Sequence, residues 1–417
     1  MKLNRNILIT LSLILICTLT FNLTSCTRVQ AEDLSKGVTA NSVPERQPDD
    51  SFKASQIRLA VELFKASSSK NTGENLLISP LSIQLALAMT ANGANGKTKQ
   101  EMEQLLGGEI SLQELNEYLH TYVESLPDEK DNKLKIANSI WFRDDKDRLT
   151  VEKDFLQTNA NYYNAQIFKS AFDGQTLKDI NNWIDINTDS MIDNALNEID
   201  PNSVMYLINA LMFDARWQTP YEKDDVYDGE FTSASKEKQS VKMMRSEENL
   251  YLNDGSAKGF VKNYKNYKYS IAALLPNEGV SIDEYIRGLT AEGLMNTLQN
   301  AEHRPVSATI PKFSYEYSLN MKDVLRSLGI NSAFDPISAD FSKMTSSKVH
   351  LDQVIHKTFI SVDERGTKAG AVTIVELKDT AVAPMPITVV LDRPFVYMII
   401  DNSTNLPIFI GATMSVK

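Results

Sequence analysis

One segment decides the predicted fold: residues 363–387 read DERGTKAGAVTIVELKDTAVAPMPI. From Thr367 to Val375 every second residue is small or β-branched, which is the alternation of a strand with one tightly buried face. Gly366 precedes this run and Pro384 and Pro386 follow it, and two prolines so close together do not occur in a central strand. A segment patterned for a sheet but bounded like an exposed loop indicates a strand that inserts on demand. An ordinary edge strand is the alternative.

Motifs in the rest of the chain decide between these alternatives. In order, they are NLLISPLSI at 75–83, ALAM at 86–89, GANGKT at 93–98, IANSIWF at 136–142, NALMF at 209–213 with Trp217, VKMM at 241–244, IPKF at 310–313, ADFS at 339–342, HKTFI at 356–360 and LDRPFVY at 391–397. This series resembles the serpin family over residues 53–415. The resemblance implies a protease inhibitor whose exposed reactive-centre loop is the segment 363–387.

Hydrophobic periodicity predicts an α+β domain over residues 53–417. Helical spacing of apolar residues covers 51–66, 81–89 and 320–328, whereas the apolar runs at 134–142 and 205–213 predict buried strands. Helices dominate the first half and strands the last third, which is the segregation of an α+β fold. The resemblance implies the serpin fold, with three β-sheets, eight or nine helices, and a dominant mixed sheet A of five strands.

Residues 1–25 are typical of a bacterial lipoprotein signal peptide. Two positive residues, Lys2 and Arg5, precede a long apolar run, as in a secretory signal rather than a membrane span. LTSC at 23–26 resembles a lipobox, which is cut before Cys26 and predicts acylation of that residue. We expect residues 26–52 to form a flexible tether that anchors the domain to a bacterial membrane, in the outer membrane or at the cell surface. A plain signal peptide and a freely secreted protein are the alternative.

Charge and cysteine content restrict the partners of the mature chain. The chain has 54 acidic and 43 basic residues, and removal of Lys2 and Arg5 with the signal changes the net charge from −11 to −13. This balance argues against nucleic acid, heparin-like polyanions and anionic lipid. Cys26 would be the one cysteine left, so the exported domain must fold without an internal disulfide. We expect a monomer.

Signals for catalysis, a metal or a cofactor are weak. GKT at 96–98 resembles the end of a phosphate-binding loop, but Ala91 stands where the first glycine is required. The four histidines form no His-Glu-x-x-His pair and lie near no cysteine pair, which argues against zinc. No Gly-x-Ser-x-Gly motif occurs, and Ser79, directly before Pro80, is expected to cap a helix. We predict that the protein is no enzyme and has no metal or cofactor site.

The resemblance assigns two polar clusters to sheet A. The shutter, beneath the centre of the sheet where its strands part, consists of Ser79, Ser82, Asn209 and His356. The breach, at the end of the gap where the loop first enters, consists of Trp217, Lys312 and Glu364. An ion pair between Lys312 and Glu364 is implied. Because buried polar groups are costly when unpaired, a shutter that re-pairs in two arrangements would act as a latch.

Small residues in the hinge of the loop favour inhibition. Non-inhibitory serpins have bulky, charged or proline residues at hinge positions, whereas this chain has permissive residues, although Gly370 and Val372 depart from the family's alanines. The hinge positions are Glu364, Gly366, Thr367, Ala369, Ala371 and Thr373. The sequence therefore predicts an irreversible suicide-substrate inhibitor. A non-inhibitory serpin that acts as a surface binding module is the alternative.

Two ways of counting place the bond that a protease would cleave. Family spacing from Gly366 gives Thr380 as the recognition residue, with cleavage before Ala381, whereas counting back from Pro394 gives a position near Ala383. Small side chains suit an elastase-like serine protease. Lys378, followed by Asp379, offers a trypsin-like site in the same loop, and cysteine proteases are a further alternative.

Overall fold

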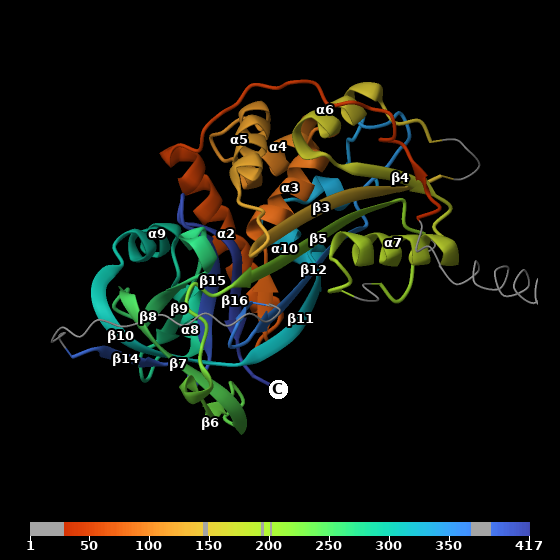
Figure 1. Cartoon of the computed structure of the whole chain (residues 1–417). Helices are drawn as coiled ribbons and strands as arrows, with labels where there is room; N and C mark the ends of the chain where they lie inside the picture. Colours follow the sequence, from red (N-terminus) through yellow and green to blue (C-terminus); the bar gives the residue numbers. More distant parts are fainter. Residues whose placement is uncertain (1–28, 145–148, 193–195, 201, 368–384) are drawn as a thin grey trace, which may run out of the picture.

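Nine α-helices lie within the residues that the structure describes, in agreement with the eight or nine expected (Figure 1). The computed structural model describes residues 29–144, 149–192, 196–200, 202–367 and 385–417. Within these ranges no helix has the length and apolar character needed to cross a membrane. The helices are α2 (Asp50–Lys70), α3 (Pro80–Ala91), α4 (Gly96–Leu106), α5 (Leu112–Ser125), α6 (Lys153–Tyr163), α7 (Gly174–Asn187), α8 (Ile282–Gly288), α9 (Ala291–Gln299) and α10 (Lys322–Ser327).

Sheet A is the dominant mixed sheet that the resemblance implies, but it has seven strands instead of five. Its order is β1 (Glu32–Asp33), β4 (Gln166–Ser170), β3 (Asn132–Arg143), β5 (Met205–Arg216), β13 (Gly366–Thr367), β12 (Gln353–Val362) and β11 (Phe313–Asn320). The two additional strands, β1 and β13, have two residues each. One extends the edge of the sheet and the other lies between two central strands, so the five long strands match the expectation.

The two further sheets that the resemblance implies are joined into one sheet of nine strands. Its strands are β14 (Ile387–Val390), β10 (Glu302–Pro311), β7 (Lys238–Asn253), β8 (Ala257–Asn263), β9 (Tyr269–Pro276), β15 (Phe395–Asp401), β16 (Leu406–Thr413) and β2 (Leu76–Ile78), with β6 (Val226–Thr232) paired to β7. The join is made by β7, which is 16 residues long. Its first part pairs with β6 and its last residues with β8, so one continuous strand belongs to both sheets.

Local sequence signals set the start of α3 but not of α10. Ser79 caps α3 by accepting a hydrogen bond of 3.2 Å from the Ser82 N–H, and Pro80 occupies the first helical position. The helix predicted over 320–328 is shorter, because β11 continues to Asn320 and α10 begins at Lys322. Residue-by-residue pairing of β11 with β12 over its full length overrides the helical spacing there.

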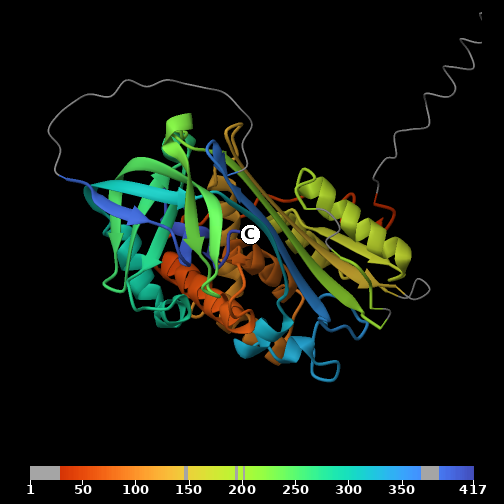
Figure 2. The same cartoon turned by 90° about the horizontal axis from the view of Figure 1, so that it is seen from below.

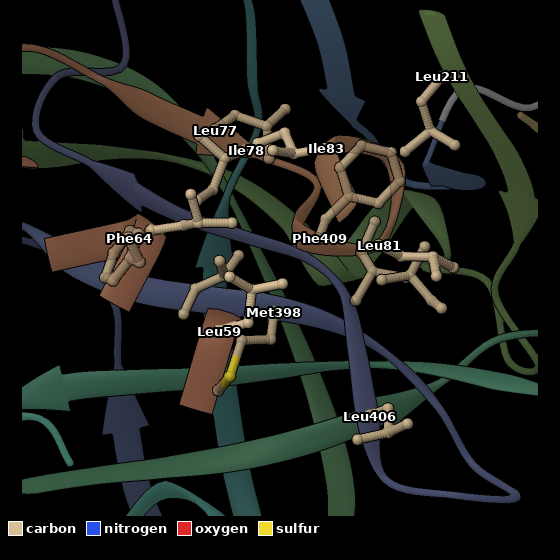
Figure 3. Packing of buried hydrophobic residues seen from close by; sticks show 14 of the residues in the cluster. Leu59, Phe64, Leu77, Ile78, Leu81, Ile83, Leu211, Met398, Leu406 and Phe409 are labelled. Atoms are coloured by element: carbon tan, nitrogen blue, oxygen red, sulfur yellow. The ribbon is translucent and has the colours of Figure 1, made fainter. Parts of the chain in front are cut away.

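Alternation along β5 separates two apolar cores, one on each face of sheet A. Tyr206 and Ile208 belong to a small core with Trp183 of α7. Leu207 and Leu211 belong to the main core beneath α2 and α3. Figure 2 shows α7, coloured yellow-green, on one face of the sheet and the orange helices on the other. Figure 3 shows the main core, in which side chains of α2, α3, β2, β15 and β16 converge. Sheet A is therefore covered on both faces around β5, whereas alternate residues of β11 at its edge are exposed.

The segment ahead of α2 lies against the domain from residue 29. The Ala31 N–H donates to the Asp179 carboxylate of α7 at 2.8 Å, and β1 pairs with the edge of β4. Further along, Arg46 donates to Glu117 of α5 at 3.0 Å. Residues 29–49 thus differ from the flexible tether that the sequence predicts, since backbone bonds to a sheet edge need no apolar side chains.

Candidate functional site

Sheet A is closed at one end and parted at the other. β12 and β5 pair directly as parallel strands from Gln353–Tyr206 to Lys357–Ala210, a ladder that we name the seam (Figure 2). At the other end of both strands, Thr367 of β13 lies between β12 and β5 and runs antiparallel to each. Residues 358–361 and 211–214 separate the seam from this point. The first residues of the predicted reactive-centre loop therefore form a wedge between the central strands.

A tight turn, the hinge turn (residues 363–367), carries the chain from β12 into β13. The Arg365 N–H donates to the Asp363 carboxylate at 2.8 Å, which closes the turn locally. Three of its backbone carbonyls accept one hydrogen bond of 2.9 Å each from the body of the protein: Asp363 from Trp217 Nε1, Arg365 from Trp217 N, and Glu364 from Tyr221 N. The body of the protein thus holds the backbone of the turn at three successive carbonyls.

Gly366 and Thr367 fit this wedge for different reasons. A Cβ on residue 366 would lie 2.1 Å from the Ala215 carbonyl oxygen, so only glycine allows β13 to approach β5. The Thr367 side chain is 2 % exposed, and its Oγ1 lies 2.6 Å from the Tyr264 hydroxyl oxygen. The residue predicted to begin insertion is therefore already buried in the intact chain.

The three predicted breach residues lie around the hinge turn. Trp217, which is 1 % exposed, provides the two donors described above. Lys312 forms an ion pair with Glu364. The hydrogen bond from Lys312 holds the pKa of the Glu364 carboxyl below its usual value, against the opposing effect of burial. The pair is about one-third exposed, so solvent screening limits its contribution to stability.

A buried lysine contacts the aromatic residues that donate to the hinge turn. Lys262 of β8 is 3 % exposed, and its Nζ lies 2.9 Å from Glu248 Oε1 of β7. The same ammonium lies 4.4 Å from the ring centroid of Tyr221 and 5.5 Å from that of Trp217. A desolvated cation is attracted to aromatic faces at such distances. Lys262 therefore fixes the two residues that donate to the hinge turn.

The shutter residues are hydrogen-bonded across the seam. The Ser79 N–H donates to Nε2 of His356 at 3.1 Å, so the neutral imidazole carries its hydrogen on Nδ1 and donates it to Asn209 Oδ1 at 3.0 Å. Asn209 Nδ2 donates in turn to the Ser82 carbonyl at 2.8 Å and to Asn138 Oδ1 at 2.6 Å. Because His356 and Asn209 are opposite residues of the seam, parting of the strands must break their bond.

Burial keeps His356 neutral. The side chain is fully buried, and loss of solvation lowers its pKa to about 3. Protonation would also remove the Nε2 lone pair that accepts from the Ser79 N–H. The shutter in this arrangement therefore requires the uncharged imidazole.

Comparisons with known proteins assign the family. A family model described as "Serpin (serine protease inhibitor)" matches residues 54–416. The chain belongs to the serpin family. A protein named "Serine protease inhibitor" from Cyanea capillata is 31% identical over 365 residues, which cover 85% of this chain and 96% of that protein. The hinge, breach and shutter described above thus lie in a serpin domain.

Solved serpin structures agree with this fold. The native state of the thermophilic serpin Tengpin is 50% identical, with a TM-score of 0.89, and covers 93% of this chain and 100% of that one. The latent state of Tengpin has a TM-score of 0.79. Human thyroxine-binding globulin, 24% identical with a TM-score of 0.80 over 88% of this chain and 99% of that one, shows the fold alone. The chain is therefore more similar to the native than to the latent form of Tengpin.

Several predicted positions of this serpin lie outside the described residues. They are Cys26, Ala369, Ala371, Thr373, Lys378, Asp379, Thr380, Ala381 and Ala383. The described hinge positions are Glu364, Gly366 and Thr367. Where the structure describes the chain, no three His, Cys, Asp or Glu side chains are grouped to hold a metal ion.

Four residues that contact the predicted site were missed in the sequence: Asn138, Tyr221, Lys262 and Tyr264. Asn138 carried a usable signal, since it is a polar residue inside the apolar motif 136–142. Lys262 and Tyr264 carried none, because charged and aromatic residues at the end of a strand are common at a protein surface. Their roles arise from contacts with residues that are distant in the sequence.

We predict that His356 makes the stability of the native state depend on pH. Its pKa is lower in the folded chain than the ordinary value of 6.5, so between these values the unfolded chain binds a proton that the native chain does not. The stabilisation is therefore complete above pH 6.5 and is lost as the pH falls toward 3. Urea unfolding should give a free energy about 1.4 kcal/mol lower at pH 5.5 than at pH 7.5 from this residue alone.

His356→Gln provides the control, because its amide does not titrate in this range. The variant is expected to be less stable than the wild type at both pH values. It should also lack the difference in the free energy of unfolding between pH 5.5 and pH 7.5 that His356 contributes. An equal pH dependence in the variant and the wild type would contradict the assignment of the neutral imidazole to the shutter.

Proposed function

We propose that this serpin is an irreversible suicide-substrate inhibitor of serine endopeptidases, which traps its target by inserting the cleaved loop into sheet A. The observation that supports the proposal is the position of β13. The loop segment already begins between β5 and β12, antiparallel to both, and the seam ahead of it is the one direct pairing of these strands. A strand that continued β13 would follow this line through the sheet.

The proposed reaction begins as ordinary proteolysis. The protease serine attacks a loop carbonyl carbon, the peptide bond breaks, and the amino-terminal part of the loop remains as an ester on the enzyme. Cleavage frees that part from β14, so it can extend β13 between the central strands. Movement of the attached protease then distorts its active site, and hydrolysis of the ester stalls.

Replacement of the seam supplies the driving force. Insertion breaks the five parallel pairs of the seam and forms an antiparallel ladder on each side of the new strand. About twelve residues that each gain roughly 1 kcal/mol of net hydrogen bonding provide on the order of 10 kcal/mol, to which burial adds. The intact protein is therefore stable for kinetic reasons, because insertion of the uncut loop is slow.

The proposed target is an elastase-like enzyme, on the basis of the small residues Thr380, Ala381 and Ala383. Lys378 makes a trypsin-like protease the alternative target, and cysteine proteases form the same kind of acyl-enzyme. We also propose that Cys26 is acylated and anchors the inhibitor to a bacterial membrane. The lipobox-like LTSC at 23–26 supports this proposal.

The variant Thr367→Arg should convert the inhibitor into a substrate. Thr367 is 2 % exposed, so a long charged side chain there would be buried without a partner at a cost of several kcal/mol. The hinge turn would leave the sheet, and insertion would lose its race with hydrolysis of the acyl-enzyme. The measurement is the number of inhibitor molecules consumed per molecule of elastase, with the covalent complex followed on denaturing gels.

Thr388→Arg is the matched control, because Thr388 of β14 is exposed. This variant should form the complex like the wild type. Formation of the complex by Thr367→Arg with unchanged stoichiometry would refute the hinge assignment. Absence of a complex in the wild-type protein with serine proteases of both specificities would instead favour a non-inhibitory binding module.

Cys26→Ala should abolish lipid attachment in the bacterial cell. The lipobox would lack its acceptor sulfur, and the acidic mature chain offers no second strong attraction to a membrane. Incorporation of labelled fatty acid and membrane fractionation measure the effect. Cys17→Ala, which leaves LTSC intact, should be labelled normally. Continued acylation of Cys26→Ala would show that the protein is not a lipoprotein of this type.

A further inference from the structure

A pair of buried hydroxyls joins the end of the hinge turn to the core of the protein, in addition to the backbone bonds from Trp217 and Tyr221. The Tyr264 hydroxyl oxygen lies 2.6 Å from Thr367 Oγ1, and the two residues are 0% and 2% exposed. Each hydroxyl is thus removed from water and depends on the other for a hydrogen bond. Burial also raises the pKa of Tyr264, so the phenol stays neutral and keeps its donor hydrogen.

The Tyr264 ring is held in place independently of Thr367. It stacks on the Trp217 ring with centroids 4.5 Å apart and planes at 10°. Phe213 of β5 contacts it edge-on, with centroids 5.2 Å apart. Tyr264 also forms a β-bridge with Trp217. The hydroxyl is therefore held beneath β13 by ring contacts that do not involve Thr367.

Departure of Thr367 from the sheet would leave the Tyr264 hydroxyl without this partner. Conversely, removal of the Tyr264 hydroxyl would leave a threonine hydroxyl buried and unpaired. Loss of the Tyr264 hydroxyl raises the free energy only of the conformation in which Thr367 lies in the sheet, because an exposed threonine can bind water instead. The pair thus favours the conformation in which β13 occupies the sheet.

We propose that Tyr264 is a positioning residue that holds Thr367 between β5 and β12 in the uncleaved protein. Insertion then starts with β13 already between these two strands. The expected effect on the rate of loop insertion rests on the proposed inhibitory function. The anchoring itself is a property of the intact chain. It assigns to Tyr264 a role in how fast insertion begins, separate from the recognition of the protease.

Hydrogen exchange of the intact protein tests the anchor directly. Tyr264→Phe keeps the ring stack on Trp217 and removes only the hydroxyl, so it should raise exchange of residues 363–367 roughly tenfold, the effect of one unpaired buried hydroxyl. Thr367→Val should act similarly by leaving the phenol unpaired. The seam peptide, residues 353–357, should be unaffected in both variants.

The double variant Tyr264→Phe/Thr367→Val separates a hydroxyl pair from a general packing effect. Replacement of both partners by apolar groups of similar shape leaves nothing unpaired, so exchange should return to near the wild-type rate. The number of inhibitor molecules consumed per protease should rise in each single variant and fall again in the double variant. Rates of initial cleavage should be unchanged throughout.

Two results would overturn the anchor: unchanged exchange of the hinge turn in Tyr264→Phe, or no recovery in the double variant. Hinge-turn exchange could rise in each single variant and recover in the double variant while the protein forms no covalent complex with any serine protease. That result would support the anchor and refute the proposed function. The two inferences therefore fail on different measurements.

Discussion

The parallel seam between β5 and β12 is the constraint on which the other features of the site depend. It consists of five residue pairs, and parallel pairing is slightly weaker per residue than antiparallel pairing. Both strands continue beyond it, but there β13 separates them. Every long strand of sheet A is otherwise paired along its length with a neighbour of the same sheet. Because β5 keeps its pairing with β3 and β12 keeps its pairing with β11, the two strands can part at the seam without loss of these other ladders.

Two clusters of buried residues hold the hinge turn and the seam in the intact chain. At the hinge end, Trp217 and Tyr221 hold the backbone of the hinge turn, and Lys262 holds both rings. At the seam, His356 and Asn209 join the strands through a bond that needs the neutral imidazole. Partial opening of the seam would leave the buried partners of these bonds unpaired, which is costly.

Much of this arrangement follows from the sequence. The alternation after Gly366 predicts that Thr367 faces the core, and the structure places its side chain there. The Ser79-Pro80 pair marks the start of α3, and the family motifs bring the shutter and breach residues to common sites. The number of strands could not be predicted, because β1 and β13 are two residues long and depend on the edges that receive them.

Contacts between distant residues account for what the sequence did not reveal. Nothing near Tyr264 indicates a partner 103 residues away, and nothing near Lys262 indicates the aromatic rings above it. Residues 29–49 are polar and contain prolines, which is typical of a tether, yet their backbone pairs with β4 and their Arg46 with α5. The composition of a segment indicates how much apolar surface it can bury. The bonds of residues 29–49 depend instead on which donors and acceptors the folded domain exposes next to them.

Thermal unfolding of the intact and loop-cleaved protein tests the central claim most directly. The cleaved chain should insert its freed strand, replace the seam by two antiparallel ladders, and melt tens of degrees higher than the intact chain. Nicking of an ordinary loop has no such effect. Identical melting curves for the two forms would contradict insertion of the loop into sheet A.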